Sequence, residues 1–189
     1  MSRCHVARQD DVIAAANGVF LQHGYRRTTM ADLAEAAGIS RPALYLVYAS
    51  KQEVFRAVLT RELRKRLEEA REAVATKRSP QDKLMAAFEG WSVRNYELTR
   101  SSPGAADLFA CSLEFATEIA NETDATFLTI IADILQPLVG KQARLDTSAT
   151  ALGRMMADSS RGLKASAKTS NELRASLREL VQVVVAALR

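Results

Sequence analysis

One short stretch, residues 28–55, constrains the fold of this 189-residue chain more than any other. Thr29 stands where a helix N-cap is expected, and Leu33 gives the helix that follows an apolar side. Gly38 then breaks the helical pattern, as glycine does where the backbone must turn sharply. Ser40 can cap a second helix that carries proline in its first turn. The pattern predicts two short helices joined by a tight turn, a helix-turn-helix.

The second of these helices has a mixed outer face. Leu44 is expected to point inward, whereas the outer face is formed by Arg41, Pro42, Ala43, Tyr45 and Leu46. A helix with such a face is typical of proteins that place it in the major groove of DNA. Periodicity alone leaves an alternative open, because a helical hairpin that only packs inside the protein has the same pattern.

Five blocks at fixed spacing add a resemblance to a known family. They are Thr29, Leu33-Ala34, Ala37-Gly38-Ile39-Ser40, Leu44-Tyr45 and Ser50-Lys51-Gln52-Glu53. Together they resemble the amino-terminal signature of the TetR family of bacterial transcriptional repressors. The resemblance covers roughly residues 9–60, and the remainder of the chain fits the family only in length and helical character.

The resemblance implies a set of DNA contacts on the second helix and its flanks: Ser40, Arg41, Pro42, Ala43, Tyr45, Leu46, Val47 and Lys51. Thr29 is expected to meet a phosphate, since a helix start attracts anions. Arg41 can hold a guanine edge through two hydrogen bonds, and Tyr45 suits a phosphate. Ala43 and Leu46 can contact thymine methyl groups, and Lys51 is expected to meet the DNA backbone as a point charge. Many relatives have histidine where this chain has Val47, and valine cannot hydrogen-bond a phosphate.

Composition predicts an all-α fold of about nine helices. The chain is 48% hydrophobic and has only eight glycines and four prolines. Apolar residues at helical spacing predict a first helix over residues 9–23 that stops at Gly24, and a strongly apolar helix over residues 124–135. We predict a three-helix helix-turn-helix domain over residues 1–50, a connecting helix over 51–78 and a ligand-binding and dimerisation domain over 79–189.

Charge is unevenly distributed between these regions. Residues 1–78 have 14 Lys/Arg and 9 Asp/Glu, a net charge of +5, whereas residues 79–189 have 12 and 13, a net charge of −1. A positive excess beside the helix-turn-helix is what a DNA-facing domain would show, although a solvated basic helix surface would produce it too.

Several other classes of protein are not expected. No stretch reaches about 18 uninterrupted apolar residues, so no membrane span is predicted, and no apolar core follows the first basic residues as in a signal peptide. Cys4 and Cys111 lie far apart and are expected to be free thiols in a cytoplasmic protein. His5 and His23 lack partners at metal-ligand spacing. No nucleophile–base pair or phosphate-binding loop is found, so neither an enzyme nor a cofactor is predicted.

Seven side chains in the carboxy-terminal part could line a cavity for a small apolar or amphipathic effector: Met85, Phe88, Trp91, Tyr96, Phe109, Phe115 and Phe127. Such pockets form between the helices of bundles. The alternative is that these residues are ordinary core, and only the family resemblance makes a cavity expected.

The end of the chain suggests a homodimer. Residues 150–163 and the segment after the Thr169 capping box have helical apolar patterns, and residues 183–188 are apolar almost all round. The resemblance implies that a second copy covers these two helices through Leu152, Met155, Met156, Leu173, Leu177, Leu180, Val181, Val184 and Leu188. The alternative is burial against the chain's own earlier helices. A two-fold dimer would place two recognition helices ~34–36 Å apart on a near-palindromic operator.

The sequence therefore predicts a homodimeric transcriptional repressor that a small molecule releases from DNA. Release requires only that the ligand bind the two states differently. Two alternatives remain: a DNA-binding regulator of the same architecture without a ligand, and a small helical enzyme or carrier whose hairpin merely resembles a DNA reader.

Overall fold

The computed structural model describes residues 3–139 and 147–188, and within these ranges the chain is helical with no strand. The predicted all-α fold is confirmed. The chain divides into two compact units, one formed by residues 1–63 and 98–120 and the other by residues 64–97 and 121–189. This division differs from the predicted boundaries, because residues 98–120 pack with the amino-terminal helices. Each unit is described separately below.

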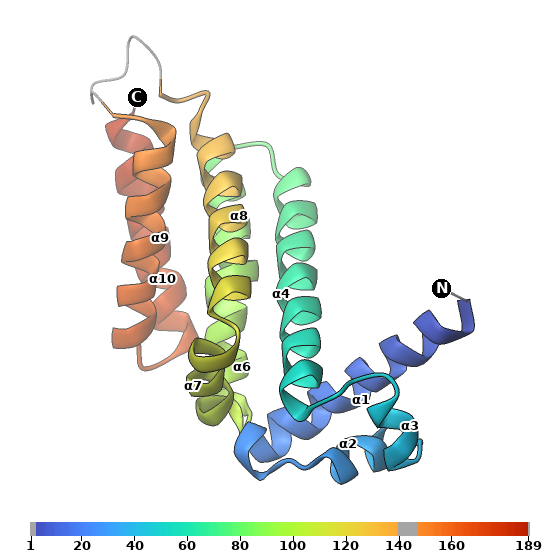
Figure 1. Ribbon diagram of the computed structural model, residues 1–189. Coiled ribbons are helices and arrows are strands. Elements are labelled where there is room, and N and C mark those ends of the chain that lie inside the picture. The colour runs from blue at the N-terminus through green and yellow to red at the C-terminus, as the bar shows by residue number, and fades with distance from the viewer. Residues whose placement is uncertain (1–2, 140–146, 189) are drawn as a thin grey trace. The chain divides into compact units, whose positions relative to one another are not determined.

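The first unit holds the predicted helix-turn-helix (Figure 1). It contains α1 (Arg3–Arg27), α2 (Met30–Ala36), α3 (Arg41–Tyr45), the first half of α4 (Lys51–Ala75) and α7 (Ala105–Phe115). Its core is formed by apolar residues that recur at helical spacing, among them Val12, Phe20, Leu33, Leu44 and Phe55. Burial of these side chains from each of the first four helices fixes α2 and α3 against α1 and α4.

Gly24 ends the regular part of α1, as the sequence predicts. Its φ of 79° and ψ of 171° are non-helical, and a positive φ favours glycine. The Thr28 hydroxyl donates to the Gly24 carbonyl oxygen at 2.6 Å, which closes the bend that leads into α2. At its other end α1 begins at Arg3, earlier than the predicted start at residue 9.

α7 docks closely on the end of α1. The Gly104 N–H, just before α7, donates to the Leu21 carbonyl oxygen at 2.9 Å. The Asp107 carboxylate accepts from the Arg26 backbone N–H at 2.8 Å and lies 3.4 Å from the Arg26 Nε. A Cβ atom at position 104 would lie 2.5 Å from the Phe20 carbonyl oxygen, so only glycine allows this approach.

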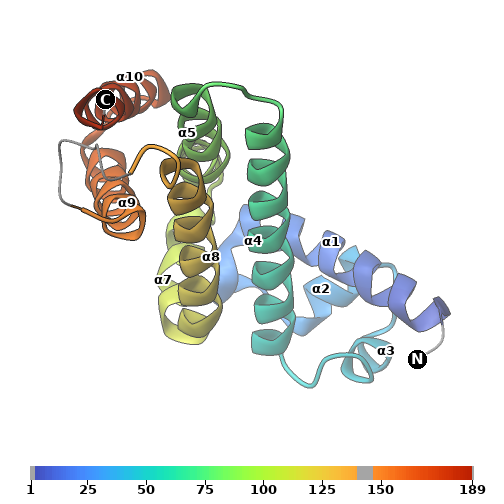
Figure 2. The ribbon, with the colours of Figure 1, turned by 90° about the horizontal axis from the view of Figure 1, so that it is seen from above.

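The second unit is a bundle around one continuous apolar core. It contains the end of α4, the start of α6 (Arg94–Ser101), most of α8 (Thr117–Leu135), and the whole of α5 (Pro80–Phe88), the π-helix η1 (Glu89–Val93), α9 (Ala149–Ser166) and α10 (Ser170–Ala187). α8 begins at residue 117, before the start predicted at residue 124. Figure 2 shows α9 and α10 side by side, and both contact η1.

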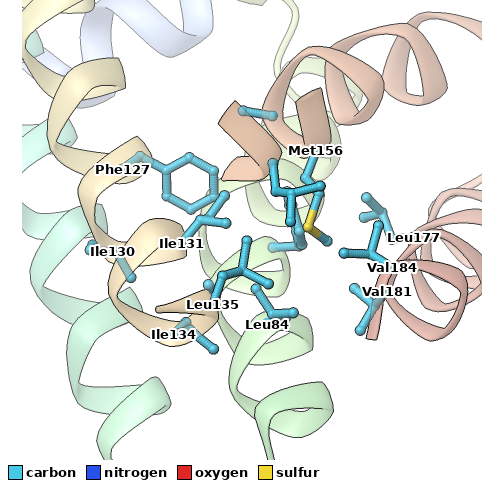
Figure 3. Close-up of a cluster of buried hydrophobic side chains, with 14 of the residues drawn as sticks. Leu84, Phe127, Ile130, Ile131, Ile134, Leu135, Met156, Leu177, Val181 and Val184 are labelled. Atoms are coloured by element: carbon cyan, nitrogen blue, oxygen red, sulfur yellow. The ribbon is translucent and has the colours of Figure 1, made fainter. Parts of the chain in front are cut away.

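Side chains from α5, α8, α9 and α10 meet in the core of this unit (Figure 3). Leu84 comes from α5, Phe127 and Leu135 from α8, Met156 from α9 and Leu177 from α10, and each is at most 1% exposed. Burying side chains of this size contributes about 1.5–3 kcal/mol each, so this core accounts for much of the unit's stability.

The π-helix η1 is tied to α10 by an ion cluster. The Arg174 Nη2 lies 2.6 Å from a Glu89 carboxylate oxygen and 2.8 Å from a Glu97 carboxylate oxygen. These hydrogen bonds, first those to Glu89, raise the pKa of Arg174 further above its ordinary value. One guanidinium therefore holds Glu89, the first residue of the π-helix, and Glu97 of α6.

Candidate nucleic-acid interface

Two N-caps and one glycine build the helix-turn-helix. The Thr29 hydroxyl oxygen accepts from the Asp32 N–H at 3.3 Å, and the Thr29 N–H donates to the Asp32 carboxylate at 2.8 Å. The Thr29 N–H and then its hydroxyl lower the pKa of Asp32. Gly38 has a φ of 64°, and the Ser40 hydroxyl oxygen accepts from the Ala43 N–H at 3.3 Å. These local bonds start α2, turn the chain and start α3.

α3 buries one side and exposes the other. Leu44 is 0% exposed, whereas Tyr45 is 43% and Leu46 is 86% exposed. Arg41 and Pro42 are also exposed. The inward and outward directions predicted for these side chains are confirmed, except that Ala43 is half-buried.

Arg41 and Tyr45 form a pair one turn apart on the exposed side of α3. The Arg41 Nη2 lies 3.5 Å from the Tyr45 hydroxyl oxygen, and its Cζ atom lies 5.6 Å from the centre of the Tyr45 ring. Among the described residues no carboxylate forms an ion pair with Arg41. The guanidinium donors that could hold a guanine edge are therefore not engaged by an acidic side chain.

Lys51 is engaged inside the protein, contrary to its predicted role as a free point charge. Its Nζ donates to the carbonyl oxygens of Tyr25 at 2.8 Å and Thr28 at 2.7 Å, and lies 4.3 Å from the centre of the Tyr25 ring. Lys51 begins α4 and thus fastens that helix to the bend between α1 and α2. Its partners precede it by more than twenty residues, and no local signal marks them.

The start of α2 is less open to a phosphate than the sequence suggests. The Thr29 N–H is taken by the Asp32 carboxylate, which also puts negative charge at this helix end. On Thr29 itself, the group that remains for a phosphate is the side-chain hydroxyl, because the residue is exposed. Thr29 therefore stays a candidate contact through its side chain only.

A cluster of aromatic rings joins α1, α4 and α7 in the core of the first unit. The Tyr25 ring centre lies 5.1 Å from that of Phe55 and 5.2 Å from that of Phe115, and Phe20 and Phe55 meet edge to face at 5.5 Å. The Arg56 side chain donates to the Phe115 carbonyl oxygen at 2.7 Å. α1, α4 and α7 thus hold one another through contacts that the sequence analysis did not foresee, because they join residues far apart in the chain.

The side chains predicted to line one effector cavity are divided between the two units. Phe109 and Phe115 belong to the first unit, and Phe109 is 55% exposed. The other five belong to the second unit, where Phe127 lies 5.0 Å from Trp91 and 5.8 Å from Phe88 between ring centres. Met85 lines a surface depression of about 400 Å³ together with Lys77, Asp82, Ala86 and Glu89. Five of the seven predicted lining residues therefore belong to one compact unit.

Most side chains assigned to the dimer interface are buried by the chain itself. Leu152, Met156, Leu173, Leu177, Val181, Val184 and Leu188 are at most 6% exposed within one copy. The prediction that a second copy covers them is wrong, because α5 and α8 already do so (Figure 3). Met155, 47% exposed, and the half-buried Leu180 remain at the surface.

The remaining sequence candidates have plain outcomes. Cys111 is a free, buried thiol, and burial raises its pKa. The side chains of Cys4 and His5 lie outside the described residues, and His23 is exposed. In the described ranges no helix is long and apolar enough to cross a membrane, and no group of three or more acidic, histidine or cysteine side chains could hold a metal ion.

The geometry defines a helix-turn-helix whose second helix, α3, exposes an arginine beside aromatic and apolar side chains. Residues 12–58 match the family model of bacterial regulatory proteins, tetR family. The chain therefore carries a helix-turn-helix region of the TetR-family type.

Curated relatives agree with this assignment over the amino-terminal region. The transcriptional activator FasR of Mycolicibacterium smegmatis is 34% identical over 84 residues, which cover 44% of this chain and 38% of FasR. The transcriptional repressor ComR of Escherichia coli is 44% identical over 59 residues, covering 31% of this chain and 28% of ComR. The chain thus matches less than half the length of either relative. Both relatives are transcriptional regulators.

Solved structures share the fold over nearly the whole chain. A TetR-family regulator from Rhodococcus sp. has a TM-score of 0.75 at 20% identity, covering 95% of this chain and 99% of its own. FadR of Thermus thermophilus, solved in complex with lauroyl-CoA, has a TM-score of 0.59 at 23% identity, covering 95% of this chain and 94% of its own. At these identities the comparison establishes the fold alone.

Proposed function

We propose that this protein is a homodimeric repressor of the TetR-family type that reads a near-palindromic operator with α3 and leaves it when a small molecule binds. The observation that carries the DNA-reading part is the division of α3, in which Leu44 is fully buried while Arg41, Tyr45 and Leu46 are exposed. A helix held in this way presents one face to a major groove.

Selection of bound sequences from random duplex DNA tests this function. We expect an enriched inverted repeat whose half-sites lie about one helical turn apart. Its affinity should fall steeply with salt, because bound cations release counterions from the phosphates. Weak, salt-dependent binding without an enriched sequence would instead mean that the helix-turn-helix is a packing element or a non-specific binder.

Arg41→Ala should relax base preference at one position of each half-site. We expect discrimination there to fall by about 1–3 kcal/mol, because a bidentate contact to guanine is lost. Repeating the selection with the variant measures this directly. Arg78→Ala, in the exposed segment between α4 and α5, is the matched control and should select the wild-type sequence. If Arg41→Ala kept the wild-type preference at every position, Arg41 would not read a base.

We propose the outward sides of α9 and α10 as the dimer contact. Small and apolar residues are exposed there: Ala151, Met155, Gly162 and Ala165 on α9, and Ala175, Val183 and Ala186 on α10. Val183 is 68% exposed in one copy and belongs to this group of exposed small and apolar residues, and a contiguous apolar surface is typical of protein–protein contacts. A second copy related by a two-fold axis would present the same surface in return.

Val183→Glu should weaken the dimer, because each copy would place an unpaired carboxylate in the contact. We expect the dissociation constant of the dimer to rise tenfold or more, equivalent to at least about 1.4 kcal/mol. Sedimentation equilibrium measures it. Val183→Thr keeps the shape without a charge and should stay near wild type. An unchanged dimer in Val183→Glu would exclude this face of α10.

The effector belongs to the carboxy-terminal bundle in this proposal. T. thermophilus FadR, which has the same fold, was solved with lauroyl-CoA, so fatty acyl-CoA is the first class to test. Thermal stability and operator affinity, measured with and without acyl-CoA of increasing chain length, should change together. The effector must bind the DNA-free form more tightly to release the protein.

A regulator without a small-molecule effector is the second candidate. It is favoured by the tight packing of Phe88 and Phe127, which are at most 1% exposed and meet edge to face. In addition, the depression beside Met85 has only one cation, Lys77, in its lining beside the carboxylates of Asp82 and Glu89, so it is not a strongly basic site for an anionic ligand. An operator affinity that no acyl-CoA or other amphipathic compound changes would favour this candidate.

A further inference from the structure

Among the described residues, the most exposed large apolar side chain lies at the end of α3, the helix proposed to read DNA. Leu46 is 86% exposed, ahead of Val183 at 68% and Phe109 at 55%. A leucine held in water at this exposure gains nothing from burial in the free protein. The side chain is therefore suited to becoming buried when the helix meets its target.

Leu46 lies near the centre of the exposed face of α3, opposite the buried Leu44. Its backbone is helical, with φ −72° and ψ −20°, and its N–H donates to the Pro42 carbonyl oxygen at 3.2 Å. Since successive residues turn by about 100°, Pro42 and Leu46 each lie within about 20° of the point opposite the buried Leu44. Tyr45 and Ala43 stand about 80° to either side of that point.

The centre of this face has no side-chain hydrogen-bonding group. Pro42 and Leu46 have neither donor nor acceptor on their side chains, and the half-buried Val47 beside them has none. The polar atoms of α3 are set to one edge, where Arg41 and Tyr45 meet. A base facing the centre therefore cannot be chosen by its donors and acceptors.

The major groove displays one apolar group, the C5-methyl of thymine. We infer that Leu46 selects a pyrimidine C5-methyl group at one base pair of each half-site, an inference that rests on the proposed function. Because the side chain reads only the methyl group, 5-methylcytosine meets the same contact and unmethylated cytosine does not. Binding of this protein is thereby sensitive to cytosine methylation at that position.

Replacing each thymine of the selected operator by deoxyuridine, one symmetric pair at a time, tests the inference. The exchange removes the C5-methyl and leaves the hydrogen-bonding pattern unchanged. We expect one pair at which affinity for the full-length protein falls about fourfold per half-site, the effect of burying one methyl group. At the same pair, 5-methylcytosine should bind more tightly than cytosine by a similar factor.

Leu46→Ala supplies the matched variant, and its high exposure means that the fold is not at risk. The variant should bind the thymine operator about as weakly as wild type binds the deoxyuridine operator, and deoxyuridine should cause no further loss. A deoxyuridine effect that persists in Leu46→Ala, or no effect at any thymine, would overturn the inference alone. Failure to enrich any sequence would overturn it together with the proposed function.

Discussion

Gly104→Ala should destabilise the first unit by about 3 kcal/mol or more. The new Cβ atom would lie 2.5 Å from the Phe20 carbonyl oxygen and 2.8 Å from the Gly24 Cα, and both are backbone atoms that cannot move aside. Relief would require α7 to move away from α1, which would break the Gly104–Leu21 hydrogen bond. The aromatic contact between Tyr25 and Phe115 would then be lost with it.

Urea unfolding of the full chain measures the change in the free energy of unfolding. Gly18→Ala is the matched control in α1, since a Cβ there meets nothing within 4 Å. Glycine inside a helix is less favourable than alanine by about 1 kcal/mol, so this control should be slightly more stable than wild type. Equal stability of the two variants would contradict the close docking of α7 on α1.

Lys51→Met should lower the free energy of unfolding by about 2–3 kcal/mol. Methionine retains the apolar stem but removes the ammonium group that holds the carbonyl oxygens of Tyr25 and Thr28. The bend that starts α2 would lose its anchor to α4, so operator affinity should fall as a consequence of disorder in the helix-turn-helix. The loss should be largest at temperatures where the variant begins to unfold.

Lys65→Met on the exposed side of α4 is the control for loss of one positive charge. Its ion pair with Glu69 at 3.9 Å is largely exposed, so its removal should change stability by less than about 0.5 kcal/mol. If Lys51→Met kept wild-type stability and lowered the salt dependence of DNA binding by about one counterion, Lys51 would contact a phosphate as the sequence analysis expected.

Local signals made the helix-turn-helix predictable. The Ser40 cap, the positive φ of Gly38 and the buried Leu44 all depend on residues within a few positions of one another. A short apolar stripe also determines which side of α3 faces the core, so Arg41 and Leu46 could be placed outward from the sequence alone. The sequence therefore contains both the shape of this site and the direction of its side chains.

Contacts between distant residues were not predictable in the same way. Lys51 looked like a free cation because its acceptors are backbone carbonyls of an earlier bend. Asp107 holds the Arg26 N–H across 81 positions, which no spacing rule reveals. The apolar stripe containing Leu177 predicts burial but does not say whose helices bury it, and here the chain's own α5 and α8 do.

The π-helix at residues 89–93 determines the direction in which the side chains of Tyr96 and Glu97 point relative to that of Glu89. In a regular α-helix Glu89 and Glu97, eight positions apart, would point about 80° away from one another. A π-helix contains one extra residue that does not add to the rotation of the side chains about the helix axis. The remaining seven steps of about 100° bring the two carboxylates within about 20° of alignment. The reach of Arg174 to both of them is the outcome of that alignment. By the same reckoning, removing one residue from this segment would leave a regular α-helix with the two carboxylates still in line, whereas converting it to a regular α-helix at full length would turn Tyr96 and Glu97 together out of their places.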